Sequence, residues 1–200
     1  MNRRVAASCL AALLAAAPAA AQPAAAASPA SGPHHRLDLR LDPAAHRLAA
    51  TDEVTWPQAP SPGPLTFVLN AALTITHAEP PVTEVPAAAA LRELGIEGAA
   101  RVPLKAYRVA STAGVKSLTL AYEGVINVPL SDPKEEYTRG FRDTTGLIGP
   151  EGVYLAGSTV WHARFGPELV TFDVTAAAPA DWHVISQGNG TSRGADGKAR

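Results

Sequence analysis

The histidines are the most chemically versatile side chains in this chain, because an imidazole can coordinate a metal ion or transfer a proton. The chain has 6 of them, and none stands in an H-E-x-x-H sequence, the spacing that places two zinc ligands and a general base on one helix. His34 and His35 are adjacent, so in a strand they point to opposite faces, and we expect both to be exposed. His162 and His183 each follow a tryptophan and could lie near each other on paired strands. Hydrogen-bonded structural roles are favoured for both over metal binding, which needs three or four convergent ligands.

Nucleophilic catalysis has little support in the sequence. Ser158 lies in a Gly-Ser-Thr segment without the G-x-S-x-G pattern that exposes a catalytic serine. The single cysteine, Cys9, lies in an N-terminal apolar stretch that we expect to be removed. No glycine-rich phosphate-binding loop is present. The sequence therefore predicts no catalytic centre in this chain.

Glu151 is the acidic residue with the most suggestive surroundings. It lies in the segment Gly149-Pro150-Glu151-Gly152, which predicts a tight turn just before a strand that carries Tyr154. A carboxylate on such a turn faces either a cleft or bulk water. The residues alone favour bulk water.

The N-terminus has the layout of a secretory signal peptide. A short basic region containing Arg3 and Arg4 precedes an apolar stretch over 5–17, and small residues follow at 19–21. The apolar run is too short for a comfortable membrane span and is interrupted by Pro18, so we expect cleavage and no stable membrane anchor. Residues 1–21 are interpreted as the signal peptide and 22–33 as a disordered Ala/Pro linker. The protein is then expected in the periplasm or outside a bacterial cell.

The rest of the chain, 34–190, predicts a β-rich domain. Leu37, Leu39 and Leu41 alternate with charged residues, as in a strand with one wet face. Similar runs predict strands at 46–56, 65–69, 73–77, 104–109, 115–125, 153–163, 170–174 and 182–186. The predicted fold is all-β, an antiparallel multi-strand sandwich with at most one short helix.

Three segments interrupt this pattern. The alanine-rich stretch at 86–94, with Gly95 behind it, is either a short helix or an irregular connection. The polar segment at 131–150 predicts a long excursion, and 191–200 predicts a truncated tail. The net charge of −1 gives no basic surface for nucleic acid and indicates no other partner.

The order of these elements resembles the N-terminal β-domain of the M1 family of zinc aminopeptidases, the gluzincin type, and in particular its divergent periplasmic branch. The resembling segments are H-R-L-D-L-R-L-D-P at 35–43, L-T-L-A-Y-E-G at 118–124, E-G-V-Y-L at 151–155, Trp161, V-T-F-D-V at 170–174 and P-A-D-W-H-V-I-S-Q-G at 179–188. In that family the zinc site lies in the following domain, as H-E-x-x-H after a G-x-M-E-N strand. This chain contains neither motif.

The resemblance implies a non-catalytic scaffold that walls the substrate cleft of a larger exported metallopeptidase. Its partner is then the catalytic domain of the same protein, with zinc expected there and no cofactor in this chain. The resemblance also implies Glu151 as the candidate residue for holding the free amino group of a peptide substrate.

A free-standing secreted β-sandwich that binds a protein or a glycan is the alternative. Burial of Trp56, Trp161 and Trp182 favours the scaffold, whereas an exposed platform of two of them favours binding.

Overall fold

The structure is a computed structural model. It describes residues 32–58, 60, 63–98, 101–110, 115–130, 144–178, 181–188, 190–194 and 197–200. The predicted signal peptide at 1–21 lies outside the described residues, as does the predicted linker up to residue 31.

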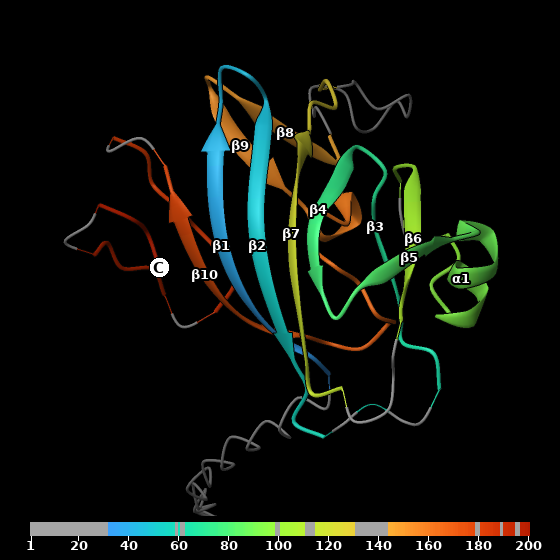
Figure 1. Cartoon of the computed structure of the whole chain (residues 1–200). Helices are drawn as coiled ribbons and strands as arrows, with labels where there is room; N and C mark the ends of the chain where they lie inside the picture. Colours follow the sequence, from blue (N-terminus) through green and yellow to red (C-terminus); the bar gives the residue numbers. More distant parts are fainter. Residues whose placement is uncertain are drawn as a thin grey trace, which may run out of the picture.

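Five strands form the larger sheet, in the order β10-β1-β2-β7-β4 (Figure 1). Their bounds are β1 (His34–Asp42), β2 (Arg47–Thr55), β4 (Leu73–Glu79), β7 (Ser117–Val125) and β10 (Thr171–Ala177). Neighbours are antiparallel except β1 and β10, which run parallel with His34 opposite Thr171. A parallel pair needs a long connection, and here most of the chain lies between the two strands.

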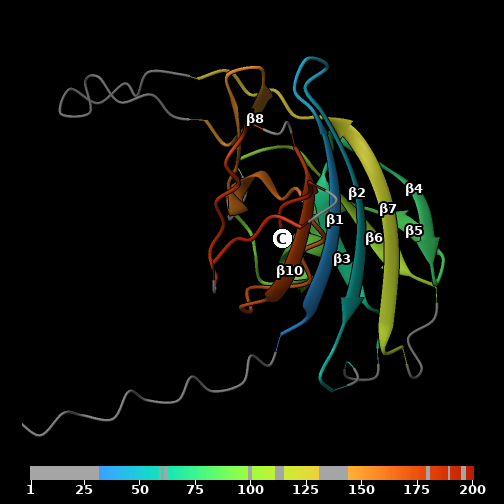
Figure 2. The same ribbon diagram turned by 90° about the vertical axis from the view of Figure 1, so that its left-hand side faces the viewer.

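A second layer covers one face of this sheet. It contains a three-stranded sheet in the order β3-β6-β5 and a separate hairpin of β8 and β9. Their bounds are β3 (Thr66–Asn70), β5 (Val82–Val85), β6 (Leu104–Val109), β8 (Gly146–Gly149) and β9 (Gly152–Leu155). In Figure 2 the chain around β8 lies to one side of β1 and β2.

The main core lies between the two layers, and a smaller core lies under the helix α1 (Ala87–Glu93). Every residue of β3 is buried, because both of its faces are covered. Phe67 and Leu69 belong to the main core, whereas Val68 belongs to the helix core with Ala90. Sheet, sheet and helix therefore form three layers over this half of the molecule.

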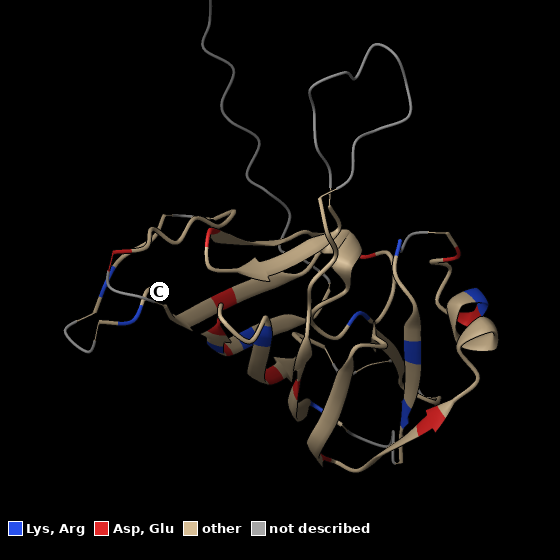
Figure 3. Ribbon diagram, turned by 90° about the horizontal axis from the view of Figure 1, so that it is seen from above, with Lys and Arg blue, Asp and Glu red and all other residues tan. Residues whose placement is uncertain are grey.

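Charged residues of both signs are interspersed over the surface, and Figure 3 shows no large region of a single sign among the described residues. This fits the small net charge of −1. In the part of the chain that the structure covers, no helix has both the length and the apolar character required to cross a membrane.

The all-β prediction is confirmed. Of the two alternatives left open for 86–94, the structure has the short helix, which is followed by Gly95 at φ +64°. The alternation of Leu37 and Leu39 with charged neighbours predicts the buried face of β1 correctly. The antiparallel prediction is wrong for β1 and β10. These two strands meet through a crossover, which strand spacing alone does not reveal.

Several element bounds are also wrong. The strand β5 was not predicted, and β8 lies inside the predicted excursion, of which 131–143 falls outside the described residues. The strand predicted at 153–163 ends at Leu155, because a 3-10 turn, Gly157–Thr159, follows and Val160 adopts φ +50°. Residues 182–186 form no strand. Instead, Ala199 of the predicted tail pairs with Ala176 of β10 in an isolated antiparallel β-bridge.

Candidate functional site

The inner face of β1 supplies the floor of the candidate site. Since side chains alternate along a strand, His35, Leu37, Leu39 and Leu41 share this face, and their Cα atoms span about 20 Å. His35, Leu37 and Leu39 are buried, and Leu41 is partly buried. Three of these four residues are leucines. His35, at one end of the row, is the only polar residue among the four.

The second layer is incomplete over β1 and β10 and leaves an apolar groove there. Two adjoining cavities, of about 550 and 420 Å³, follow the groove. We call them the histidine cavity and the Glu151 cavity, after residues that line them. Their shared lining comes from β9, β10 and the segments that follow each: Val153, Leu155, Trp161, Val174, Ile185 and Ser186. The groove is thus mainly apolar, with polar groups at its two ends.

A fully buried histidine–carboxylate pair lies at one end. His35 on β1 and Asp52 on β2 are both 0% exposed, and His35 Nδ1 is 2.9 and 3.0 Å from the two Asp52 oxygens. The ring of His162 meets the ring of His35 edge to face, with centroids 5.0 Å apart. Both histidines line the histidine cavity. Three titratable groups from distant parts of the sequence therefore meet in one cluster.

Burial sets the charge state of this cluster. Desolvation, followed by the nearby charge of His35, lowers the pKa of His162 to about 4, so its ring is uncharged at neutral pH. Tyr122 lies fully buried on β7. Desolvation, assisted by the charge of Asp52, raises the pKa of Tyr122 well above its ordinary value. The cluster therefore lies in a medium that disfavours unpaired charge.

Glu151 lies at the other end of the groove. It occupies the turn between β8 and β9, where Gly152 adopts φ +157°, and its side chain is exposed. It lines the Glu151 cavity together with Trp182 and His183. The turn was predicted from the glycines around Glu151. The structure places this carboxylate both at a cavity rim and in contact with solvent.

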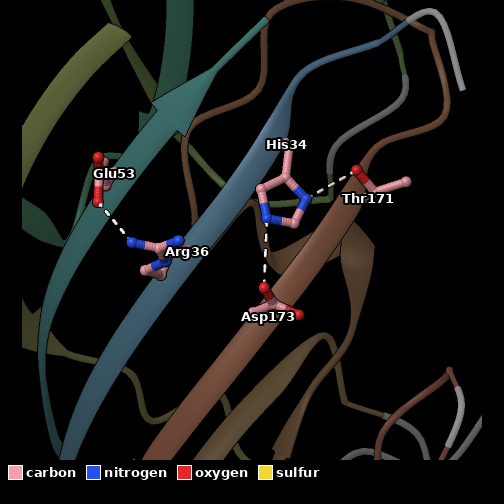
Figure 4. Close-up of polar contacts among 5 residues, drawn as sticks. All are labelled: His34, Arg36, Glu53, Thr171 and Asp173. Atoms are coloured by element: carbon pink, nitrogen blue, oxygen red, sulfur yellow. Dashed lines mark hydrogen bonds and ion pairs between the residues drawn. The ribbon is translucent and has the colours of Figure 1, made fainter. Parts of the chain in front are cut away.

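Polar groups on the outer face of the sheet have a different role. Figure 4 shows His34 of β1 beside Thr171 and Asp173 of β10, and Arg36 of β1 beside Glu53 of β2. The distances are 2.9 Å from His34 Nδ1 to the Thr171 hydroxyl and 3.4 Å from Nε2 to Asp173. These cross-strand pairs join β1 to its neighbours.

The predicted positions of the histidines are partly wrong. His34 and His35 do point to opposite faces, but His35 is fully buried where exposure was expected. His162 and His183 are not brought together. His162 contacts His35, and His183 is exposed. One signal for the buried pair was present in the sequence, since His35 falls in phase with the leucines of β1.

The three tryptophans form no exposed platform. Trp56 and Trp161 are half-buried and pack against the main core, and the Trp56 ring meets Phe165 with centroids 5.2 Å apart. Trp182 is also half-buried, at the wall of the Glu151 cavity. By the criterion set from the sequence, this half-burial favours neither the scaffold nor the binding module.

The described residues contain no group of three or more histidine, cysteine, aspartate or glutamate side chains with the geometry to hold a metal ion. In comparisons with known proteins, no family model matches the chain and no curated protein is significantly similar to it. The resemblance to the M1 family therefore stays a prediction.

Proposed function

We propose that this chain is a non-catalytic N-terminal β-domain of an exported M1-like zinc metallopeptidase, in which it walls the substrate cleft. In this proposal the protein is periplasmic or secreted, its partner is the catalytic domain of the same protein, and zinc is held by that domain. The support comes from the motif order in the sequence and from the incompletely covered groove in the fold.

The observation that carries the proposal is the apolar rim of the groove. Tyr154 is 55% exposed, Leu169 is 85% exposed and Ile185 is 90% exposed. Tyr154 and Ile185 line the histidine cavity, and Leu169 precedes Val170 of the same lining. Large apolar side chains gathered in this way are typical of a surface that another protein unit covers. A catalytic domain packed on this rim would bury them.

Glu151 has a defined part in the proposal. Its exposed carboxylate is free to face a cleft formed against the partner domain, where a negative charge would attract the ammonium group of a peptide N-terminus. In the full protein, Glu151→Gln is expected to raise KM for peptides with a free N-terminus about tenfold, as expected for a lost charged contact of 1.4 kcal/mol. The matched control is Glu84→Gln, an exposed glutamate on β5 that lines neither cavity.

The decisive experiment reads the gene downstream of codon 200 and assays the full protein. The proposal expects an in-frame continuation with G-x-M-E-N and then H-E-x-x-H, and zinc-dependent aminopeptidase activity. A stop codon at that point, with stable folded protein made from this chain, would contradict it. A free-standing β-sandwich that binds a protein or a glycan is then the better candidate, and the aromatic lining of the groove by Trp161 and Trp182 favours it.

A further inference from the structure

One edge of β10 faces away from the rest of its sheet, because β10 is the outermost of the five strands (Figure 1). This edge is paired at Ala176, whose N–H and C=O groups exchange hydrogen bonds of 2.8 and 3.0 Å with Ala199. Backbone groups alternate between the two edges along a strand, so Phe172 and Val174 direct theirs to the same edge as Ala176. No described residue pairs with the N–H and C=O groups of these two residues. An unpaired edge of this kind is a template for a further strand.

A cavity of about 460 Å³ lies along the unpaired part of the edge. Phe172 and Val174 line it from β10, and Val184 lines it from the segment that follows the strand. All three residues are partly exposed. Ala199 and Arg200 also line the cavity, at the end where the edge is already paired. The space beside the edge is therefore open to an added segment, and part of its wall is apolar.

The position of Ala199 indicates the direction in which such a segment would run. Its pairing with Ala176 is antiparallel, so a strand in line with Ala199 passes Val174 and then Phe172. Residues that face each other in this type of pair exchange both of their backbone hydrogen bonds. Their side chains lie on the same face of the sheet, so those facing Val174 and Phe172 would contact the apolar part of the cavity wall. A segment with apolar residues at these two alternate positions fits the edge.

The residue between these two positions would face Asp173, on the outer face of the sheet. The Asp173 side chain is 74% exposed. Its ion pair with His34 Nε2, at 3.4 Å, is charged only when that ring is protonated. A lysine or arginine that faces Asp173 would form a favourable cross-strand pair. Charge complementarity therefore specifies the pattern apolar–basic–apolar for the added segment.

The same carboxylate disfavours a second copy of this chain on the edge. If two β10 strands paired with Phe172 of each facing Val174 of the other, Asp173 of one copy would face Asp173 of the other. Like charges directly opposite each other destabilise an antiparallel pair. A separate peptide of complementary charge therefore fits this edge better than a second copy does.

We propose that the free edge of β10 binds an extended peptide segment of another protein, antiparallel to the strand and with the pattern apolar–basic–apolar. The two apolar residues pair with Val174 and Phe172, and the basic residue pairs with Asp173. The inference goes beyond the proposed function and does not rest on it, since every group involved belongs to this chain.

Three peptides test the proposal on the exported chain by calorimetric titration. The probe is acetyl-S-T-V-K-V-T-S-amide, acetylated so that no positive charge lies beside Arg200. A control with glutamate in place of lysine is expected to bind about fivefold more weakly, because a like-charge pair replaces an opposite-charge pair. A control with N-methyl groups on both valines is expected to bind about tenfold more weakly, because two backbone hydrogen bonds are lost. Equal binding of the three peptides would overturn the proposal.

A charge-swap variant tests the contact with Asp173. Asp173→Lys is expected to reverse the preference, so that the glutamate peptide binds more tightly than the lysine peptide. Glu84→Lys makes the same change of charge at an exposed position of β5 that does not line this cavity, and it should keep the parent's preference. An unchanged preference in Asp173→Lys would refute the site.

Hydrogen exchange locates the bound peptide on the parent protein, without any substitution. The N–H groups of Phe172 and Val174 should exchange fast in the free protein and about tenfold more slowly with the peptide bound. Those of Thr171 and Asp173 point toward β1, in line with the hydrogen bond from the Thr171 N–H to Pro33, and serve as the control. Slow exchange at Phe172 and Val174 before the peptide is added would also overturn the proposal, because another segment or a second copy would already cover the edge.

Discussion

Asp52 of β2 pairs with His35 of β1 in the interior, and the next residue along, Glu53, pairs with Arg36 on the outer face. Each pair is separated by 17 residues, and each joins the same two strands. The period of two sends one pair into the core at 2.9 Å and leaves the other in solvent at 3.4 Å. Adjacent residues thus provide a natural comparison between a buried and an exposed charged pair.

Removing one partner of the buried pair is expected to be costly. Asp52→Ala leaves His35 buried without its partner, and we expect a loss of about 3–5 kcal/mol in the free energy of unfolding. Glu53→Ala is the matched control and should cost at most about 1 kcal/mol, because its pair is exposed and screened. Urea denaturation of both variants measures the difference, and equal losses would show that burial does not set the strength of the pair.

The stability of the domain should fall in acid through His162. Its pKa is about 4 in the folded state and 6.5 in the unfolded state, so between these values the unfolded chain binds more protons. Stability from this residue is therefore complete above pH 6.5 and declines as the pH falls toward 4. Desolvation and the charges of His35 and Arg164 oppose protonation, and the charge of Asp52 only partly offsets them.

Thermal or urea unfolding at pH 7 and pH 4.5 tests this expectation. The parent should lose about 2 kcal/mol more than His162→Phe between the two conditions. His183→Phe is the control, since His183 is exposed and should leave the pH dependence as in the parent. An unchanged pH dependence in His162→Phe would show that His162 is not neutralised by burial.

Gly124 is expected to tolerate no side chain. A Cβ at this position of β7 would lie 2.0 Å from the carbonyl oxygen of Ala72, which is backbone and cannot turn away. We expect Gly124→Ala to lower the free energy of unfolding by about 1–3 kcal/mol or to prevent folding. Gly157→Ala is the control, because no atom lies within 4 Å of its added Cβ. A stable Gly124→Ala protein with the parent's melting temperature would contradict the close approach of β4 and β7.

The sequence leads us to propose that the protein is exported and that its signal peptide is cleaved, and this proposal can be tested separately. Intact-mass analysis of protein from the periplasm or medium is expected to give a mature chain that begins at Gln22. Ala21→Leu places a large residue at the proposed cleavage position, so an uncleaved precursor should accumulate. A mature N-terminus well inside the β-domain would exclude the proposed signal peptide.

The amphipathic strands were the most predictable part of the fold. The alternation in β1 reports directly on burial, since one face of the strand is exposed to solvent and the other is packed against the core. The pairing of β1 with β10 could not be predicted in this way, because it depends on a crossover and not on local spacing. The end of β9 was missed for another reason, namely that Val160 adopts a left-handed conformation that β-branched residues rarely take.

The candidate site was less predictable than the fold. Glu151 was located on its turn by the glycines that flank it. The cluster of His35, Asp52 and His162 was missed, because a buried histidine in the sequence looks the same as an exposed one until its strand phase is compared with the neighbouring leucines. The contact of His162 with His35 depends on the path of an irregular segment, for which no periodic signal exists.

The parallel pairing of the first and last strands has a consequence for how the chain reaches this fold. The His34 and Thr171 side chains join positions 137 residues apart, so the sheet can be completed only after the chain has been synthesised as far as β10. Such distant contacts slow folding, because a long loop must close before they form. Until β10 arrives, β1 is an open edge to which a second chain can add. A newly made chain therefore exposes this edge until β10 has emerged.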